Sequence, residues 1–286
     1  DVGIALALSP IFRIEFCLQG STASFPIAKH RARHDLEMPK TLVMIPTYNE
    51  SQNVEIMYER VRAVLPNTEI LFVDDNSPDG TGSILDQLAN LDTLVHVLHR
   101  SGKLGIGSAH LAGIEWAYEN DVHTLVTMDA DCTHSPEEVS TFIDASTSSA
   151  VVVGSRFIGG GGIKEWPLHR RMITRTSHLM TQLILGMRYD ATGAYRVYRL
   201  DLIPQRLFSV IRSHDYSFFY ESLKIIDLAK YPIAEVPIVL APRFEGNSKM
   251  RPIDMVHGIT YLVGLGLRTR LPLGSLKREI RGLSHA

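Results

Sequence analysis

Acidic clusters at the ends of short apolar runs constrain the fold of this chain more than any other feature. The apolar run 70–73 leads into the acidic turn 74–80, and the apolar run 125–128 leads into the acidic turn 129–131. Apolar runs of this length that are bounded by turn residues are typical of strands buried on both faces of a parallel sheet. We therefore expect both acidic turns at the carboxyl edge of one sheet, which is where open α/β sheets bind ligands.

Strand and helix signals alternate along the chain from Thr41 onward. The expected strands are 42–45, 70–73, 94–98, 123–128, 150–153, 194–198 and 233–240. The expected helices are 54–65, 83–91, 104–118, 136–146, 168–185 and 218–228. Repeated β-α units of this length predict a mostly parallel, doubly wound α/β sheet with flanking helices.

The periodicity divides the chain into three parts. Residues 1–38 show no sustained period and are predicted to be a poorly ordered N-terminal extension. Residues 39–252 form the predicted α/β domain, and residues 253–286 form a predicted helical tail. No apolar run reaches the roughly 18 residues that a membrane-spanning helix needs, so any membrane contact is expected to be peripheral. For the apolar part of the tail, an interfacial helix with basic anchors and an ordinary packed helix both remain open.

The bulk composition restricts the class of partner. The chain of 286 residues carries a formal net charge of -2, and a nucleic-acid partner is not expected because such proteins usually carry a basic excess. A local excess of lysine and arginine in residues 243–281 would suit a phosphate-bearing ligand or an acidic membrane face. Cys17 and Cys132 are too few for a disulfide framework, so a cytoplasmic location is the expectation.

The turn 129–131 places Asp129 and Asp131 on either side of Ala130. Carboxylate oxygens suit a hard divalent cation such as Mg²⁺ or Mn²⁺, although aspartate is also common in ordinary turns after strands. The second acidic turn, Arg156 after the next strand, and the lack of a glycine-rich phosphate turn after the first strand favour the metal interpretation. Because carboxylates gathered at one edge repel one another unless a cation joins them, we predict a divalent metal that carries a nucleoside diphosphate.

Short motifs in a definite order connect these features. They are I-P-T-Y-N-E at 45–50, V-D-D-N-S-P-D-G-T-G at 73–82, R-S-G-K-L-G-I-G-S-A at 100–109, M-D-A-D at 128–131, G-S-R at 154–156, T-G-A-Y-R at 192–196, Y-S-F at 216–218 and R-F-E-G-N-S-K-M at 243–250. Together they resemble glycosyltransferase family 2 with the GT-A fold, and within it the dolichol-phosphate mannose synthase group, over residues 40–252. The R-x-x-G-x-S-K-M ending is the piece that points to a polyprenyl-phosphate acceptor.

The resemblance implies a nucleotide pocket on the loop after the first strand. Pro46, Tyr48 and Glu50 would hold the nucleobase and the ribose of the donor. Val73 and Asp75, at the end of the second strand, would complete that pocket.

The same resemblance implies a metal site at the D-x-D motif. Asp129 and Asp131 would bind the metal, and Ala130 would lie against the nucleotide through its backbone. Thr133 would be a further ligand, at a position where many family members carry glutamine or serine.

The resemblance also implies basic residues that offset the negative charge of the phosphates. Arg156 would meet the diphosphate, and Arg243 and Lys249 would lie near the diphosphate and the acceptor phosphate. Arg196 is a further residue that could hold the acceptor. Together with Asp131, the residues Arg156, Arg243 and Lys249 form the implied catalytic set.

The resemblance implies inverting, metal-dependent transfer of mannose from GDP-mannose to the phosphate of a polyprenyl (dolichyl) phosphate lipid. A phosphate oxygen is already ionised near neutral pH, so such an acceptor needs no strong general base. Peripheral contact with the cytoplasmic face of a membrane, and a membrane-anchoring partner subunit, are the expected associations.

Three alternatives remain open. The donor could be UDP-glucose or another nucleotide sugar. The acceptor could be a hydroxyl in polysaccharide or glycolipid assembly, which would need a base such as Asp190, Asp215 or Glu221. The chain could also be a catalytically silent nucleotide-sugar-binding protein, which the intact acidic motif argues against.

Overall fold

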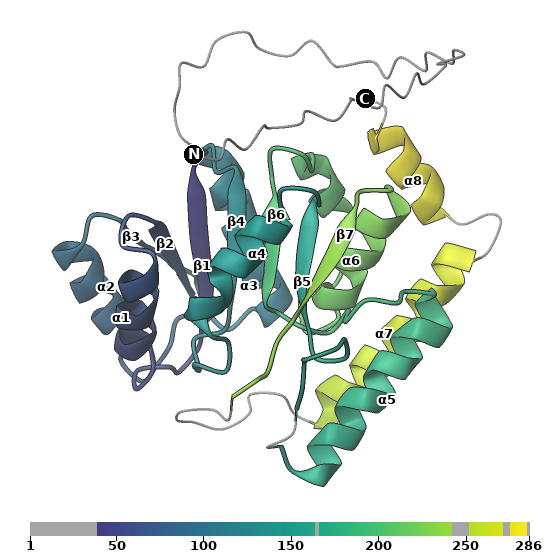
Figure 1. Cartoon of the computed structure of the whole chain (residues 1–286), viewed down its shortest axis with the longest axis horizontal. Helices are drawn as coiled ribbons and strands as arrows, with labels where there is room; N and C mark the ends of the chain where they lie inside the picture. Colours follow the sequence, from purple (N-terminus) through teal and green to yellow (C-terminus); the bar gives the residue numbers. More distant parts are fainter. Residues whose placement is uncertain (1–38, 164–165, 242–251, 271–274, 285–286) are drawn as a thin grey trace, which may run out of the picture. The chain divides into compact units, whose positions relative to one another are not determined.

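A computed structural model describes residues 39–163, 166–241, 252–270 and 275–284. All of these residues belong to one unit, which spans 38–286. They form a seven-stranded sheet with helices packed on both of its faces (Figure 1).

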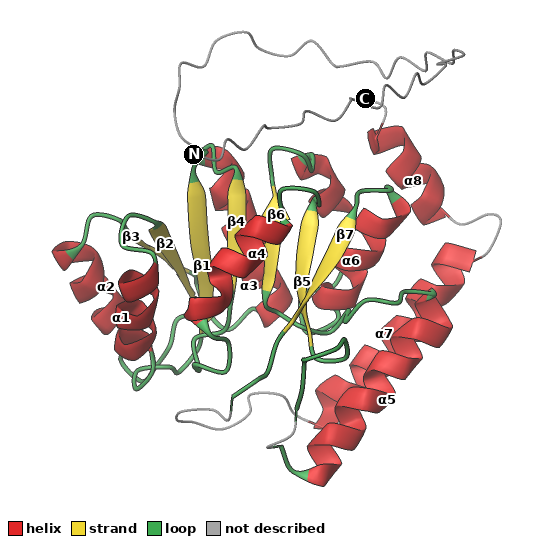
Figure 2. Cartoon of the chain, viewed as in Figure 1, coloured by secondary structure: helices red, strands yellow, loops and turns green. Residues whose placement is uncertain are grey.

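The elements follow the predicted alternation closely (Figure 2). The strands are β1 (Thr41–Thr47), β2 (Glu69–Asp74), β3 (Val95–His99), β4 (Thr124–Thr127), β5 (Val151–Ser155), β6 (Arg196–Arg199) and β7 (Ile233–Pro237). The helices are α1 (Val54–Val64), α2 (Thr81–Leu91), α3 (Ile106–Glu119), α4 (Val139–Ala145), α5 (Leu168–Leu185), α6 (Phe218–Leu228), α7 (Pro252–Arg270) and α8 (Ser275–Ser284). Short 3-10 turns occupy Pro136–Glu138 and Gln205–Val210.

The sheet is mostly parallel, as predicted. Its strand order is β3-β2-β1-β4-β6-β5-β7, and β6 runs antiparallel to both of its neighbours. The pairs β1 with β2, β1 with β4, β2 with β3 and β5 with β7 are parallel. Because β1, β2 and β4 run side by side in one direction, the turns that follow them meet at one edge.

Each central strand is buried on both faces, which explains its unbroken apolar run. On β1, Leu42 and Met44 pack into the core beneath α3 and α6, whereas Val43 and Ile45 pack into the core beneath α1 and α4. Successive side chains of a strand point to opposite faces, so both faces must be apolar. Helix α3 packs so closely that a Cβ added at Gly113 would lie 2.6 Å from the sulfur of Met44.

Some elements differ from the prediction in detail. The predicted strand 194–198 begins only at Arg196 and is antiparallel. The predicted helix 136–146 begins as a 3-10 turn, with proline at its first position, before α4 starts. The range of the predicted helical tail 253–286 contains two helices, α7 and α8; on α8, Leu276 and Ile280 are buried and Lys277 and Arg278 are exposed. Short amphipathic segments of this kind depend on tertiary packing for most of their stability.

Helices α5 and α7 pack against each other beyond the β5–β7 edge of the sheet (Figure 1). Among the described residues, no helix is both long enough and apolar enough to cross a membrane.

Candidate functional site

A cleft of about 1350 Å³ opens at the carboxyl ends of β1, β2, β4 and β5. One end, here called the loop end, is lined by residues 46–48, Glu50, Asp75 and residues 103–105. The acidic turn 129–134 lies next to it, and the opposite end, here called the helix end, is lined by α5 and α7. The cleft therefore lies at the edge of the sheet that the sequence predicted.

The loop end is held by hydrogen bonds between the β1 loop and the turn after β2. The Asn49 N–H donates to Ser77 Oγ at 3.0 Å, and the Glu50 N–H donates to Thr81 Oγ1 at 2.9 Å. Asp79 accepts from the Thr81 hydroxyl at 2.6 Å and from the Ser51 N–H at 3.1 Å. The D-D-x-S-x-D-G-T motif thus acts as a clip that fixes the backbone of the first loop.

Asp75 lies under this clip and is paired with Arg100. Its carboxylate accepts from Arg100 Nη1 at 2.5 Å and from the Leu104 N–H at 3.1 Å. Burial raises the pKa of the Asp75 carboxyl, and the Arg100 guanidinium opposes that rise. Beside it, the Lys103 ammonium lies 4.2 Å from the centroid of the Tyr48 ring, a cation–π contact. The loop end therefore combines an aromatic face, a carboxylate and a cation.

The side chain of Val73 does not face the cleft. It is fully buried in the core under α3, whereas Pro46, opposite it on β1, and Asp75 line the cleft. The reason is the alternation along β2, which turns the Val73 side chain toward the helices. A contact between Val73 and a nucleotide would come from its main chain, and its place in the pocket stays a prediction.

The acidic turn is held by hydrogen bonds within the turn. Asp131 Oδ1 accepts from the Thr133 N–H at 3.1 Å and from Thr133 Oγ1 at 2.7 Å, and Asp131 is only 4% exposed. The Asp129 N–H donates to His134 Nδ1 at 3.0 Å. Between them, Cys132 has a φ of 60°, in the left-handed region that tight turns require. Asp129, Ala130, Asp131 and Thr133 all line the cleft, as predicted.

The donor set of this turn suits a hard divalent cation. Asp129 and Asp131 offer carboxylate oxygens and Thr133 offers a hydroxyl oxygen, which are the ligands that Mg²⁺ and Mn²⁺ prefer. Among the described residues, no group of three His, Cys, Asp or Glu side chains is placed to hold a metal by itself. A metal at this turn would therefore need oxygens from a bound ligand, such as a diphosphate, to complete its coordination.

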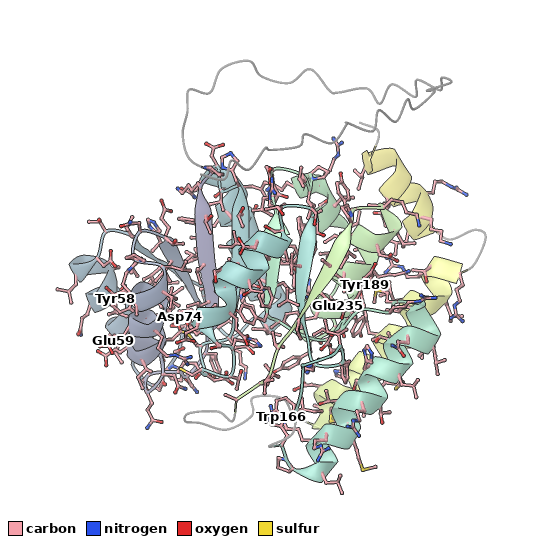
Figure 3. The ribbon with its side chains drawn as sticks, viewed as in Figure 1. Tyr58, Glu59, Asp74, Trp166, Tyr189 and Glu235 are labelled. Atoms are coloured by element: carbon pink, nitrogen blue, oxygen red, sulfur yellow. The ribbon has the colours of Figure 1, made fainter. Side chains whose placement is uncertain are left out.

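Arg156 lines the cleft but is firmly held by Asp190. Its Nε and Nη2 donate to the two carboxylate oxygens at 2.7 and 2.6 Å, and Nη2 also bonds Thr192 Oγ1. Asp190 is fully buried and also accepts from the Arg156 N–H; its own N–H bonds Glu235, labelled in Figure 3. Burial raises the pKa of Asp190, but the Arg156 guanidinium outweighs it and the pKa lies below its ordinary value. This bidentate pair fixes the direction of the arginine.

The three carboxylates named as bases for a hydroxyl acceptor differ in position. Asp190 is committed to Arg156, and Glu221 is fully buried with Oε2 accepting from the N–H groups of Arg212 and Ser213. Of the three, only Asp215 lies in the described cleft wall, where it accepts from the Ser217 N–H. Asp190 and Glu221 are therefore structural residues.

Arg196 does not reach the cleft, contrary to the expectation that it could hold the acceptor. It is fully buried, and its guanidinium donates to the carbonyl oxygens of Gly193, Ala191 and Phe219 and to the hydroxyls of Tyr198 and Ser222. The Arg196 side chain points from β6 toward α6, and this direction keeps its guanidinium out of the cleft. The remaining predicted pair, Arg243 and Lys249, lies outside the described residues.

Trp166 and Arg170 are among the cleft residues that the sequence did not indicate. Trp166, labelled in Figure 3, precedes α5, and the Arg170 guanidinium carbon lies 3.6 Å from the centroid of its ring. Both residues line the cleft. The available signal was an aromatic residue four positions before an arginine at the start of the predicted helix 168–185.

Comparisons with known proteins agree with this geometry. The family model described as glycosyl transferase family 2 matches residues 42–207. A polyprenol monophosphomannose synthase of Mycolicibacterium smegmatis is 38% identical over 235 residues, covering 81% of this chain and 89% of that protein. An undecaprenyl-phosphate mannosyltransferase of Micrococcus luteus is 39% identical over 233 residues, covering 81% of this chain and 96% of that protein.

Solved structures with low sequence identity share the fold. Glucosyl-3-phosphoglycerate synthase of Mycobacterium tuberculosis, in complex with Mn²⁺, UDP and phosphoglyceric acid, aligns with a TM-score of 0.54 at 17% identity, covering 81% of this chain and 78% of that chain. Residues 1–349 of TarS from S. aureus, in complex with UDP-GlcNAc, align with a TM-score of 0.51 at 18% identity, covering 84% of this chain and 70% of that chain. The chain therefore belongs to glycosyl transferase family 2 and is a glycosyltransferase with the GT-A fold.

Proposed function

We propose that this glycosyltransferase moves mannose from GDP-mannose to the phosphate of a polyprenyl phosphate lipid, with inversion and with a divalent metal. The names of the relatives from M. smegmatis and M. luteus, both of which join mannose to a polyprenyl phosphate, support the proposal. The observation that carries it is the cleft itself, whose loop end and acidic turn continue into a helix end formed by α5 and α7, two helices that expose large apolar side chains.

The helix end carries both apolar and polar side chains. Met172, Ile173 and Met180 of α5 and Ile259 and Leu262 of α7 line it, and their apolar surface would bury an isoprenoid chain favourably. Polar side chains of the same helices also line it: Arg170, Thr174, Thr176, Ser177, Thr181, Asp254 and His257. The names of the two mannosyltransferase relatives therefore favour a lipid phosphate over a polysaccharide hydroxyl as the acceptor.

On the donor side, each residue has a proposed task. Pro46, Tyr48, Glu50 and Asp75 bind the nucleobase and ribose, in the backbone frame that the clip fixes. Asp129, Asp131 and Thr133 hold the metal, with Ala130 against the nucleotide. The metal, when bound, supplies positive charge to the leaving diphosphate.

Basic residues offset the negative charge of the leaving diphosphate, which is assigned to Arg156, and of the acceptor phosphate. Arg156 is held by Asp190 in a direction that lets its exposed edge meet a phosphate in the cleft. Arg170, with Arg243 and Lys249, adds further cations. A phosphate oxygen attacks the anomeric carbon in line with the departing diphosphate, and no side chain has to remove a proton. Such a site works by electrostatic stabilisation of the charge that develops in the transition state.

Peripheral contact with the cytoplasmic face of a membrane is part of the proposal. Large apolar side chains on α5 and α7 are between 41% and 68% exposed: Leu168, Met172, Ile173, Leu179, Leu183, Ile253, Val256, Ile259, Val263 and Leu267. Their spacing gives each helix an exposed apolar face, and Arg175 and Arg270 are exposed on the same helices. Apolar faces with arginine anchors are typical of helices that lie in the membrane interface. A membrane-anchoring partner subunit is the alternative cover for these faces.

The decisive experiment is transfer of labelled mannose from GDP-mannose into an organic-extractable product, with a polyprenyl phosphate acceptor. We expect product with Mg²⁺ or Mn²⁺ and none after chelation. Product from UDP-glucose instead would keep the mechanism and change the donor. Product only with a hydroxyl acceptor would overturn the lipid-phosphate assignment and direct attention to Asp215.

Flotation with anionic liposomes tests the membrane contact separately. We expect the protein to float with vesicles that contain phosphatidylglycerol and to be released at high salt, because arginine contacts with anionic lipid are screened. Failure to float with any vesicle would favour a partner subunit as the cover.

A further inference from the structure

His134 lies beside the acidic turn and was not assigned any role by the sequence. It is 4% exposed, and its ring centroid lies 5.0 Å from that of Tyr195, which is fully buried. Tyr195 is in turn stacked on Phe142 at 4.2 Å and donates its hydroxyl to the Ser135 carbonyl at 2.8 Å. The imidazole ring is therefore anchored to the core on one side while it lines the cleft on the other.

The anchored ring holds the main chain of Asp129. The Asp129 N–H donates to His134 Nδ1 at 3.0 Å, and the same nitrogen is 3.8 Å from Asp129 Oδ2. A ring nitrogen that accepts an N–H carries no proton, so the bond assigns the tautomer with hydrogen on Nε2. The turn is thus held at two points, Asp131 by Thr133 and Asp129 by His134.

We propose that His134 is a positioning residue for the metal site: its Nδ1 fixes the Asp129 backbone, and with it the direction of the Asp129 carboxylate. The inference rests on the proposed function, because it assumes that Asp129 binds the metal. Residues behind the ligands typically change metal affinity by about 10- to 100-fold when they are removed. No proton transfer by His134 is involved.

Substitutions of His134 separate three roles that the ring could have. Asparagine keeps an acceptor close to the place of Nδ1 but loses the ring. Phenylalanine keeps the ring against Tyr195 but loses the acceptor. Glutamine carries its amide near the place of Nε2, and would preserve metal binding only if that nitrogen were itself a ligand.

The measurement is the affinity for Mn²⁺ in the presence of GDP, read from the electron paramagnetic resonance signal of free Mn²⁺, on the full chain. We expect His134→Phe to weaken Mn²⁺ binding about 10-fold or more and His134→Asn to stay within about threefold of the unsubstituted protein. The transfer assay, run beside it, should show the same order in the Mn²⁺ concentration for half-maximal rate. Thermal unfolding should show the opposite order, because Phe preserves the packing against Tyr195 better than Asn does.

His123→Phe is the matched control. His123 also accepts a backbone N–H with Nδ1, from Lys40 at 3.2 Å, but it lies at the opposite end of β4. We expect its loss to leave Mn²⁺ binding unchanged, which separates a general loss of stability from a local effect on the acidic turn.

Several results would overturn the inference. Mn²⁺ affinity in His134→Phe equal to that of the unsubstituted protein would overturn it and leave the proposed function standing. Retention by glutamine with loss by asparagine would make Nε2 a direct ligand. Absence of Mn²⁺ binding by the unsubstituted chain with GDP would remove the metal site and this inference together. If the substituted chains do not fold, long-range proton–nitrogen NMR correlation on the unsubstituted protein tests the inference by identifying the tautomer of His134. A hydrogen on Nδ1 would contradict the hydrogen bond from the Asp129 N–H and overturn the inference.

Discussion

The loop end and the helix end of the cleft are built in opposite ways. At the loop end, hydrogen bonds link Asn49, Glu50 and Ser51 to side chains of the turn after β2, so the polar groups have fixed partners. At the helix end, α5 and α7 expose large apolar side chains that no described element covers. A preformed polar pocket suits a nucleotide from solution, whereas uncovered apolar helices suit a ligand that arrives with its own apolar surroundings. The contrast teaches that one cleft can bind a water-soluble ligand at one end and a membrane-embedded ligand at the other.

The largest expected effect is on the acidic turn, where the two ends meet. Asp131→Ala should lower the metal-dependent turnover by about 1000-fold, equivalent to about 4 kcal/mol, because a carboxylate is lost from the proposed metal site. Turnover in the presence of Mn²⁺ is the measurement. Asp144→Ala, at an exposed position on α4, is the control and should change little. Near-normal turnover in Asp131→Ala would contradict the metal role.

The next effect concerns the Arg156–Asp190 pair. Asp190→Asn should lower the free energy of unfolding by about 3 kcal/mol, because it leaves a buried arginine without its counter-charge. Urea unfolding at neutral pH measures it. The exposed pair of Arg199 and Asp201, with Nη2 to Oδ2 at 2.6 Å, offers the control Asp201→Asn, which should cost about 1 kcal/mol or less.

The same pair predicts a pH dependence with a defined sign. The pKa of Asp190 is lowered in the folded protein, so its contribution is present above the unfolded pKa of about 4 and is lost as the pH falls through the lower folded value. Unfolding free energies between pH 7 and pH 3 should therefore fall more steeply in the unsubstituted protein than in Asp190→Asn. Parallel curves would show that the carboxylate is not stabilised in its charged form.

A charge on the exposed apolar face should affect the helix end alone. Val256→Glu, at a position 54% exposed on α7, should lower binding to anionic vesicles about 10-fold and leave GDP binding unchanged. Sedimentation with vesicles and a GDP titration are the two measurements. Leu91→Glu, on α2 and 84% exposed, is the matched control and should affect neither. An equal loss of vesicle binding in Val256→Glu and Leu91→Glu would contradict the distinction between the two ends.

The smallest effect should come from the clip at the loop end. Thr81→Val keeps the volume but removes the acceptor of the Glu50 N–H and the donor to Asp79. We expect the KM for the donor to rise about fivefold, equivalent to about 1 kcal/mol, with an unchanged rate at saturation. Steady-state kinetics would show it. A fall in the rate at saturation, with KM unchanged, would instead mean that the clip acts on the chemical step. The control is Thr93→Val, at an exposed turn, which should change neither KM nor the rate at saturation.

Local patterns predicted much of the fold and part of the site. The alternation of strands and helices, the mostly parallel sheet and the presence of the D-x-D turn in the cleft agree with the structure. These features depend on apolar runs and turn residues that are close together in the chain. The burial of the Val73 and Arg196 side chains could not be predicted, because the direction of a strand residue depends on which face of the sheet meets which helix, and that is a matter of register.

Long-range contacts were out of reach of the sequence patterns. The insertion of β6 between β4 and β5, the packing of α5 on α7, and the ring of His134 against Tyr195 all join segments that the chain order separates. The acidic turns and the basic residues could be recognised as chemistry from their order along the chain, since residue type and spacing suffice for that. Their arrangement into one cleft that runs from the loop end to α5 and α7 was decided by tertiary packing, because burial and direction depend on every element that covers a side chain.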